Sequence, residues 1–367
     1  MTPTPPPFGD DLAAWSRAVS NLLDTPAVVL SVTGDPASDK AHGMTQSVEL
    51  TVQSHGRVRR AYLKTPREDL YGETLAADAL REAAWRVEGY DWFPGHARCA
   101  AVGRSAAGSL VRLEPLTDTP WLLEWAEPGI RYADRLDDLE ALGADRAAAE
   151  ARRLCSAMVA LHRPVAGDQT VLYRRALRDA LIVPVQRLVD SADSFWATRR
   201  DLRVDVEHAC AQWRLLLTDR GDRLRYVHHD FHPWNVFIGP CDREVRTIGA
   251  RLPGVGDPND DFAAFTVNYL WFSHASNGRV SGAYRAGLES FRRTFRELGG
   301  DDGGPALMAP FLAKRLLVLL NPTYYPAMPP ATGAWLEELL RRCLRDEIDL
   351  VRGDVDLDFV REPTGVT

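Results

Sequence analysis

The chain has 367 residues, of which 45% are hydrophobic and 26% are charged, and its formal net charge is −7. This is an ordinary globular balance, and the length favours roughly two domains. The acidic net charge argues against a nucleic-acid partner, because phosphate contacts need a basic face. No segment approaches the ~20 consecutive apolar residues that span a bilayer, so we expect no membrane association.

Cysteine usage and the first residues bear on the cellular compartment. The five cysteines are scattered and form no C-x-x-C pair, so we expect neither a disulfide framework nor a thiolate zinc site. A reducing, cytoplasmic location is therefore the default. The opening MTPTPPPFGD has no apolar run after a basic start, so we expect no signal peptide. Its prolines favour a disordered leader over residues 1–10.

The first third of the chain is predicted to be rich in strands. Apolar residues recur at helical spacing over 11–23 and again over 73–87. Between these helices, three alternating or β-branched runs separated by turn residues predict an antiparallel meander, and further strand-like runs follow the second helix. The predicted strands are 27–34, 45–53, 57–64, 97–103, 109–114 and the run from 121 to the break at Pro128-Gly129.

The rest of the chain is predicted to be mostly helical. Short β-like pieces interrupt the helical pattern between residues 226 and 262. The clearest helical runs are 146–162, 263–272, 283–298, 307–320 and 333–351. We therefore expect a strand-rich unit over 11–126 and a larger helical unit over 127–367, which is an α+β architecture.

The stretch HHDFHPWN, residues 228–235, carries the strongest chemical signal. Asp230 and Asn235 are five residues apart with Pro233 between them, so the segment is expected to form a rigid loop. Phosphoryl transfer needs a carboxylate that accepts or orients a hydroxyl proton, and an oxygen ligand for magnesium. Two other readings stay open. The histidines His228, His229 and His232 with Asp230 are suitable ligands for a transition metal, and an aspartate near a proline also suits a simple turn.

This stretch resembles the catalytic loop of the aminoglycoside phosphotransferase and choline kinase family. The family loop reads H-x-D-x-x-x-x-N, frequently as HGDFHPGN, and six positions of residues 228–235 agree with it. The resemblance implies a two-lobed, protein-kinase-like fold with a small antiparallel-sheet N-lobe and a larger helical C-lobe. It also implies that Asp230 is the catalytic base, Asn235 a magnesium ligand and His228 a structural support of the loop.

The following segment resembles the family less closely. Family members continue with a strand ending in I-D-W and then with G-D-P-x-x-D-L-A, and Gly256-Asp257-Pro258 and Asp261 match the second pattern. Asp261 is then expected to support the loop. Counting back without a gap places Gly249 where the family has its second magnesium-binding aspartate. The sequence offers Asp257 and Asp242 as replacements, although a turn and a surface hairpin explain these two equally well.

The family resemblance also assigns nucleotide-binding residues in the strand-rich unit. Kinase-like enzymes hold the α- and β-phosphates with a lysine on the third strand and position it with a glutamate on the next helix. Lys64 ends the third predicted strand, and the chain has only two other lysines. Glu82 is the expected partner of Lys64, with Glu73 as its rival. Gly43, Thr45 and Gln46 are candidates for the nucleotide-covering turn, and the backbone at Glu124 and Ala126 for the adenine edge.

Together these features predict an ATP-dependent phosphotransferase that acts on a hydroxyl group of a small molecule. The expected cofactors are ATP, or another nucleoside triphosphate, and Mg²⁺. The aromatic loop 321–335 either lines the acceptor site or packs on the surface. Because Gly249 replaces a metal ligand, a catalytically impaired module that binds a nucleotide or another ligand is the main alternative. A third possibility is an enzyme that modifies a peptide hydroxyl together with a partner protein, which nothing in the sequence indicates.

Overall fold

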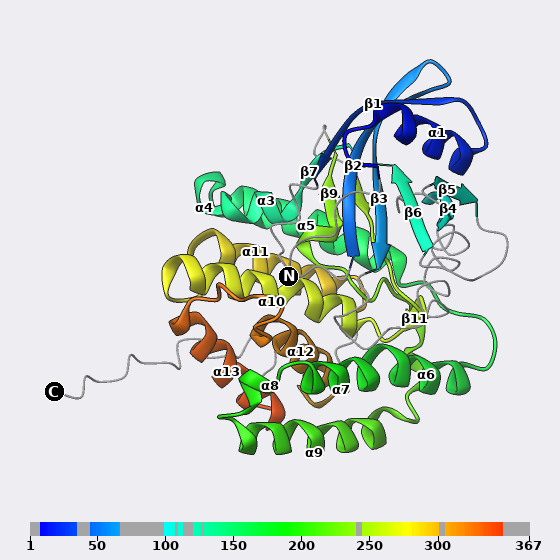
Figure 1. Cartoon of the computed structure of the whole chain (residues 1–367). Coiled ribbons are helices and arrows are strands. Elements are labelled where there is room, and N and C mark those ends of the chain that lie inside the picture. Colours follow the sequence, from blue (N-terminus) through cyan, green and yellow to red (C-terminus); the bar gives the residue numbers. More distant parts are fainter. Residues whose placement is uncertain are drawn as a thin grey trace. The chain divides into compact units, whose positions relative to one another are not determined.

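The structure is a computed structural model, and it describes residues 8–34, 45–66, 99–106, 109–112, 120–125, 128–239, 244–300 and 305–347. The chain divides into two compact units, Met1–Pro128 and Gly129–Thr367, where the sequence predicts a division at residue 126. Figure 1 shows a sheet with one helix in the first unit and a mostly helical second unit. No described helix is long and apolar enough to cross a membrane.

The first unit is built on a six-stranded antiparallel sheet with the strand order β1-β2-β3-β6-β4-β5. The predicted strands agree closely with those observed, and helix 11–23 is confirmed as α1. The described elements are α1 (Leu12–Leu23), β1 (Ala27–Gly34), β2 (Thr45–Ser54), β3 (Arg57–Pro66), β4 (Cys99–Ala106), β5 (Ser109–Arg112) and β6 (Pro120–Trp125). The predicted helix 73–87 lies outside the described residues.

Helix α1 covers one face of this sheet, because the apolar stripe of the helix packs on the apolar side chains that alternate along the strands. Asp11 caps the helix by accepting a hydrogen bond from Ala14 N at 2.9 Å. Trp15 is fully buried and joins alternate residues of β2 and β3 in one core. Phe8 and Gly9, which the sequence assigns to the leader, pack onto this helix. The Phe8 ring lies edge-on to Trp15 at 5.0 Å, and Trp15 Nε1 donates to Gly9 O at 2.9 Å.

The second unit is a set of packed helices with short strands between them. Its helices are α3 (Tyr132–Asp137), α4 (Leu139–Leu142), α5 (Ala144–Leu161), α6 (Gln169–Leu177), α7 (Val183–Asp190), α8 (Asp193–Trp196), α9 (Arg200–Leu217), α10 (Asn259–Asn277), α11 (Gly282–Glu297), α12 (Pro305–Leu320) and α13 (Pro330–Leu344). A π-helical turn, Arg178–Ile182, joins α6 to α7. The strands are β7 (Ile130–Arg131), β8 (Arg225–Tyr226), β9 (Val236–Ile238), β10 (Val245–Thr247) and β11 (Val255–Gly256).

Helix α10 is the central helix of the second unit. It is buried along most of its length, including Phe262 and Phe265, and it packs against α11 and α12. A helix that is apolar on all sides belongs inside a protein, which explains this position. Two acidic residues, Asp260 and Asp261, nevertheless lie in its first turn with no exposed surface. Buried carboxylates need partners, and these two hold the functional loop described next.

Candidate functional site

The loop at residues 227–235 leaves β8 and ends in a short 3₁₀ turn, Pro233–Asn235, before β9. Pro233 suits the first position of this turn because its fixed φ is already helical and its missing N–H is not needed there. The His232 side chain accepts a hydrogen bond from Trp234 N at 3.3 Å. His229 adopts a left-handed conformation with φ +62°, at the position where the family loop has a glycine.

Asp261 holds the backbone of this loop through hydrogen bonds. Its two carboxylate oxygens accept hydrogen bonds from the amides of His228 and His229, each at 2.8 Å. His162 Nε2 lies 3.1 Å from the same carboxylate. Burial alone would raise the pKa of Asp261, but the contacts with His162 and the field of His228 lower it. Asp261 is therefore ionised and fixes the direction in which the loop leaves β8.

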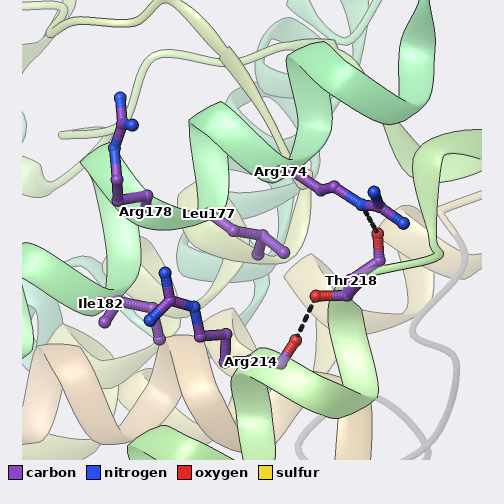
Figure 2. A pocket seen from close by; sticks show the side chains of 6 residues that line it. All are labelled: Arg174, Leu177, Arg178, Ile182, Arg214 and Thr218. Atoms are coloured by element: carbon purple, nitrogen blue, oxygen red, sulfur yellow. Dashed lines mark hydrogen bonds between the residues drawn. The ribbon is translucent and has the colours of Figure 1, made fainter.

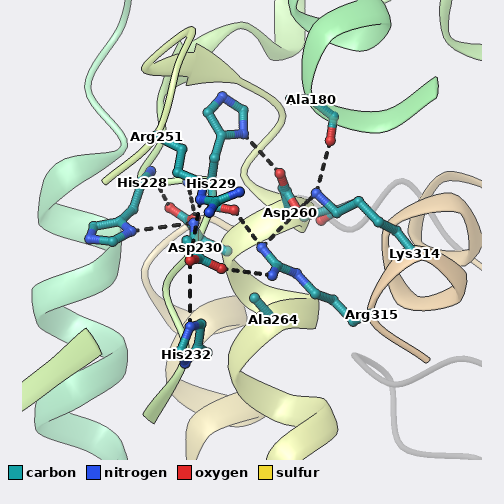
Figure 3. Close-up of polar contacts among 12 residues, drawn as sticks. Ala180, His228, His229, Asp230, His232, Arg251, Asp260, Ala264, Lys314 and Arg315 are labelled. Atoms are coloured by element: carbon teal, nitrogen blue, oxygen red, sulfur yellow. Dashed lines mark hydrogen bonds and ion pairs between the residues drawn. The ribbon is translucent and has the colours of Figure 1, made fainter. Parts of the chain in front are cut away.

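The carboxylate of Asp230 lies among cationic and polar side chains from three segments (Figure 3). Its Oδ1 accepts a hydrogen bond from the Arg315 guanidinium at 3.0 Å, and its Oδ2 accepts one from Asn235 Nδ2 at 3.2 Å. His232 Nε2 and Arg251 Nε each lie 3.5 Å from Oδ2. Although burial opposes ionisation, these groups hold the pKa of Asp230 well below its usual range.

A buried ion network connects this carboxylate to helix α12. Arg315 donates to the backbone oxygen of His229 at 2.5 Å and lies 3.5 Å from Asp260. Asp260 also contacts Lys314 Nζ at 2.5 Å and His229 Nδ1 at 2.8 Å. Burial lowers the pKa of Lys314 to about 8, and repulsion by Arg315 contributes, while Asp260 acts in the opposite direction. Lys314 and Arg315, which are adjacent on α12, thus balance the negative charges of Asp230 and Asp260.

Gly249 lies directly against the side chain of Asn235. A Cβ atom built on Gly249 would stand 3.1 Å from Asn235 Nδ2 and 3.3 Å from Oδ1. Ile248 N also donates to the Asn235 carbonyl at 3.0 Å. The structure therefore brings together the two positions that the family resemblance assigns to magnesium ligands, and one of them has no side chain.

The residues around Asn235 do not fit a tightly held magnesium ion. Mg²⁺ favours octahedral oxygen coordination and is usually bound by one or two carboxylates together with phosphate oxygens and water. Here the nearby carboxylate of Asp230 faces two guanidinium groups, from Arg251 and Arg315. Within the described part of the chain, no group of three or more His, Cys, Asp and Glu residues is placed to hold a metal. This includes the histidines of the loop, so they form no transition-metal cluster with Asp230.

Asp257, the residue suggested as a replacement ligand, is engaged in a buried ion pair. Arg223 donates to both of its oxygens, at 2.6 and 2.9 Å, and Tyr173 Oη donates to Oδ2 at 2.7 Å. The amide of Asn259 donates to Oδ1 at 2.9 Å. These contacts occupy both oxygens of Asp257 and favour a structural role. The other suggested replacement, Asp242, lies outside the described residues.

In the first unit, Lys64 pairs with Glu124. Lys64 Nζ lies 2.6 Å from Glu124 Oε2, and the two side chains are 14% and 5% exposed. The sheet register explains the contact, since Lys64 is paired with Leu122 and Tyr62 with Glu124, which places Lys64 and Glu124 on one face. Sequence reasoning valued Glu124 for its backbone and chose Glu82 as the lysine's partner. Glu82 lies outside the described residues.

Other nucleotide-site candidates are only partly described. Thr45 and Gln46 begin β2, where they pair with Pro66 and Thr65. Glu73, Gly43 and Ala126 lie outside the described residues.

Aromatic side chains lie next to the loop at residues 227–235. Trp234 stacks on Trp271 of α10 with ring centroids 5.8 Å apart, and Trp271 contacts Tyr325 at 4.9 Å. Tyr325 belongs to the predicted loop 321–335, of which only 321–329 is a loop, because α13 already begins at Pro330. Burial raises the pKa of its hydroxyl, and the nearby charge of Asp230 adds to this shift. This part of the loop therefore lies within the electrostatic reach of Asp230.

Sequence reasoning missed Arg251, Asp260, Lys314 and Arg315. Arg251 is two residues after Gly249, and Asp260 is adjacent to Asp261, so both were within the region of interest. Lys314 had a further signal, because it is one of only three lysines in the chain. Arg315 had none, since it is 85 residues from Asp230 in the sequence.

A separate small cavity lies between α6, the π-helical turn and α9 (Figure 2). Its volume is about 150 Å³, and it is lined by Arg174, Leu177, Arg178, Ile182, Arg214 and Thr218. Two of its arginines have acidic partners, because Arg174 pairs with Asp219 at 2.6 Å and Arg178 with Asp179 at 2.8 Å. None of the candidate residues lines this cavity.

Comparison with known proteins identifies the fold. No family model and no curated protein matches the sequence. Among solved structures, an ethanolamine kinase from Plasmodium vivax matches with a TM-score of 0.51 and 7% identity, covering 90% of this chain and 85% of its own. A thermostable mutant of aminoglycoside phosphotransferase APH(4)-Ia, in complex with AMP-PNP and hygromycin B, matches with a TM-score of 0.50 and 11% identity, covering 91% and 98%. The chain has the two-lobed, protein-kinase-like α+β fold.

Proposed function

We propose that the protein is an ATP-dependent phosphotransferase that acts on a hydroxyl group of a small molecule. The observation that supports this most strongly is the contact between Asp230 and Asn235, which lie on one loop with 3.2 Å between Oδ2 and Nδ2. The kinase-like fold alone would not support it, because one fold hosts many functions. The proposal rests on the chemistry of this loop.

Asp230 is the residue that would act on the acceptor. A carboxylate offers about four acceptor positions, and the two shortest hydrogen bonds to Asp230, from Arg315 and Asn235, use two of them. An acceptor hydroxyl can therefore donate to Asp230 while its oxygen attacks the terminal phosphorus. The bond from that phosphorus to the bridging oxygen breaks, and the hydroxyl proton passes to Asp230. The low pKa of Asp230 makes it an orienting group more than a strong base.

Lys64 is proposed to hold phosphates of the nucleotide. Its ammonium group is fixed by Glu124 on the polar face of the sheet. A lysine that is held in one place by a buried carboxylate presents its remaining N–H groups in fixed directions, as phosphate binding requires. Glu82 stays a candidate second partner. The aromatic residues Trp234, Trp271 and Tyr325 are proposed to contact the acceptor.

The proposal is tested by calorimetric titration with ATP and by ADP release in the presence of hydroxyl compounds. We expect ATP to bind and at least one class of alcohol to stimulate ADP release. Asp230→Asn should reduce this release by roughly a hundredfold or more. Asp219→Asn, which changes a carboxylate that is 82% exposed, is the matched control and should not. Absence of any nucleotide binding would contradict the proposal.

A second candidate function is a module that binds nucleotide without efficient transfer. The observation in its favour is Gly249, which places a glycine against Asn235 where the family has a carboxylate. ATP binding without ADP release, over a broad panel of alcohols and peptides with hydroxyl side chains, would favour this function. Release that depends on Asp230 would exclude it.

A further inference from the structure

We infer that the Arg251 guanidinium takes the place of a magnesium ion at this loop, so that the protein binds its nucleotide without requiring a divalent metal. The inference rests on the proposed function, because it assumes that a nucleotide phosphate approaches Asp230. It goes further by assigning the positive charge at that position to a residue of the chain.

The space that a metal-binding carboxylate would occupy is tight. Gly249 has φ +71°, and its missing Cβ would stand within 3.3 Å of three atoms of the Asn235 carboxamide. A side chain there needs both a strained backbone and a displaced Asn235. Two residues further along the chain, a cation lies beside the Asp230 carboxylate, since Arg251 Nε is 3.5 Å from Asp230 Oδ2.

The net charge of the site is conserved by this exchange. An aspartate together with a doubly charged magnesium ion carries one positive charge, as does a glycine together with an arginine. The geometry is also compatible, because a guanidinium has five N–H donors in a planar fork that suits carboxylate and phosphate oxygens at once. Arg251 can therefore face Asp230 with one edge and a phosphate with another.

Arg251 is better placed for this role than the other guanidinium at Asp230. The Arg315 side chain is 10% exposed, and it is committed to Asp230, Asp260 and the His229 carbonyl. The Arg251 side chain is 32% exposed, so more of its surface faces solvent than that of Arg315. Its backbone is nevertheless fixed, because Arg251 N donates to His228 O at 2.9 Å and Arg251 O accepts from Gly254 N at 3.0 Å.

The experiment compares ATP affinity in excess Mg²⁺ and in excess EDTA by titration calorimetry. We expect the two dissociation constants to agree within about threefold. A site that depends on a metal would instead lose most of its ATP affinity in EDTA. Arg251→Gln should weaken ATP binding in EDTA by roughly tenfold to a hundredfold, the value of a charge-assisted hydrogen bond. Arg251→Lys keeps the charge and should recover part of this loss.

The control is Arg285→Gln, which removes an exposed arginine of α11 that pairs with Glu289. Its ATP affinity should equal that of the unchanged protein. ATP binding that requires Mg²⁺ would overturn the inference and leave the proposed function standing. Metal-independent binding that Arg251→Gln does not weaken would also overturn it. Absence of nucleotide binding under both conditions would overturn the proposed function and the inference together.

The double variant Gly249→Asp with Arg251→Gln tests the exchange in the opposite direction. It removes the guanidinium and returns a carboxylate beside Asn235, so its ATP affinity should rise when Mg²⁺ replaces EDTA. Circular dichroism and thermal unfolding establish that this variant is folded before the titration. A folded double variant that binds ATP as tightly in EDTA as the unchanged protein does would contradict the role of Arg251.

Discussion

Gly249 and the Asn235 side chain are in contact so close that a methyl group on Gly249 would stand 3.1 Å from Asn235 Nδ2. The two residues lie on different segments, one in the 3₁₀ turn before β9 and one after β10. The hairpin of β9 and β10 sets this distance through its register, in which Val236 pairs with Thr247. The contact is therefore a property of the fold that a substitution at either position must disturb.

Gly249→Ala should destabilise the protein by roughly 2 kcal/mol, because it combines a left-handed backbone with the contact to Asn235. Gly278→Ala is the matched control. Gly278 has a similar φ of +66°, but a Cβ there would meet nothing within 4 Å. Gly278→Ala should therefore lower the unfolding free energy only through the strained backbone conformation, by about 1 kcal/mol. Urea unfolding of both variants measures the difference, and equal losses would show that the Asn235 contact is readily relieved.

Glu124→Gln should weaken nucleotide binding and destabilise the first unit. The change leaves the Lys64 ammonium, 14% exposed, without its buried carboxylate, at a cost of about 3 kcal/mol. Glu49→Gln is the control on the same sheet. Glu49 lies 4.0 Å from the largely exposed Arg60 and accepts a hydrogen bond from Tyr62 that a glutamine can also accept. Its replacement should cost under about 1 kcal/mol. Thermal unfolding and ATP titration compare the two variants. Equal effects of both would contradict the role of the Lys64–Glu124 pair.

Asp257→Asn distinguishes a structural carboxylate from a metal ligand. The variant leaves Arg223, which is 6% exposed, without its charged partner, so we expect a loss of about 3 kcal/mol in unfolding free energy. The ratio of ATP affinities in Mg²⁺ and EDTA should stay the same. Calorimetry on the folded variant, at a temperature well below its unfolding, measures this ratio. A change in the ratio with little loss of stability would instead make Asp257 a metal ligand.

The protein should lose stability in acid through the carboxylates around the loop. The pKa values of Asp230, Asp260 and Asp261 are all lowered on folding despite their burial. The unfolded chain then binds protons that the folded chain does not, so the stabilisation is complete above pH ~4 and falls as the pH drops below it. Urea unfolding at several pH values measures the slope. Asp261→Asn should make that slope shallower, whereas Asp219→Asn, at an exposed position, should not.

The local elements were predictable from the sequence because their signals are local. The helix at 11–23 and the first three strands follow from apolar spacing and turn residues, and the structure confirms them within a few residues. The proximity of Asp230 and Asn235 was also predictable, since five residues with a proline between them leave little freedom.

The partners of these residues were not predictable in the same way. Glu124 is 60 residues from Lys64, and their contact depends on the pairing of β3 with β6. Arg315 reaches Asp230 only because α12 packs against α10. Such contacts depend on sheet order and helix packing, for which no spacing rule exists in a single sequence. The family resemblance assigned Glu82 as the lysine's partner, which lies outside the described residues, and it did not assign the side chain of Glu124.

The position of Arg315 on α12 links the electrostatics of Asp230 to the aromatic loop that follows the helix. Arg315 is six residues before Asn321, where the loop begins, so about 9 Å of rigid helix separates them at 1.5 Å per residue. A shift by one such rise that moved Arg315 directly away from Asp230 would stretch their 3.0 Å hydrogen bond beyond bonding distance. The carboxylate would then lose a cation and become a stronger base. The packing of α12 therefore helps to set the basicity of Asp230 from a residue that is 85 positions away in the sequence.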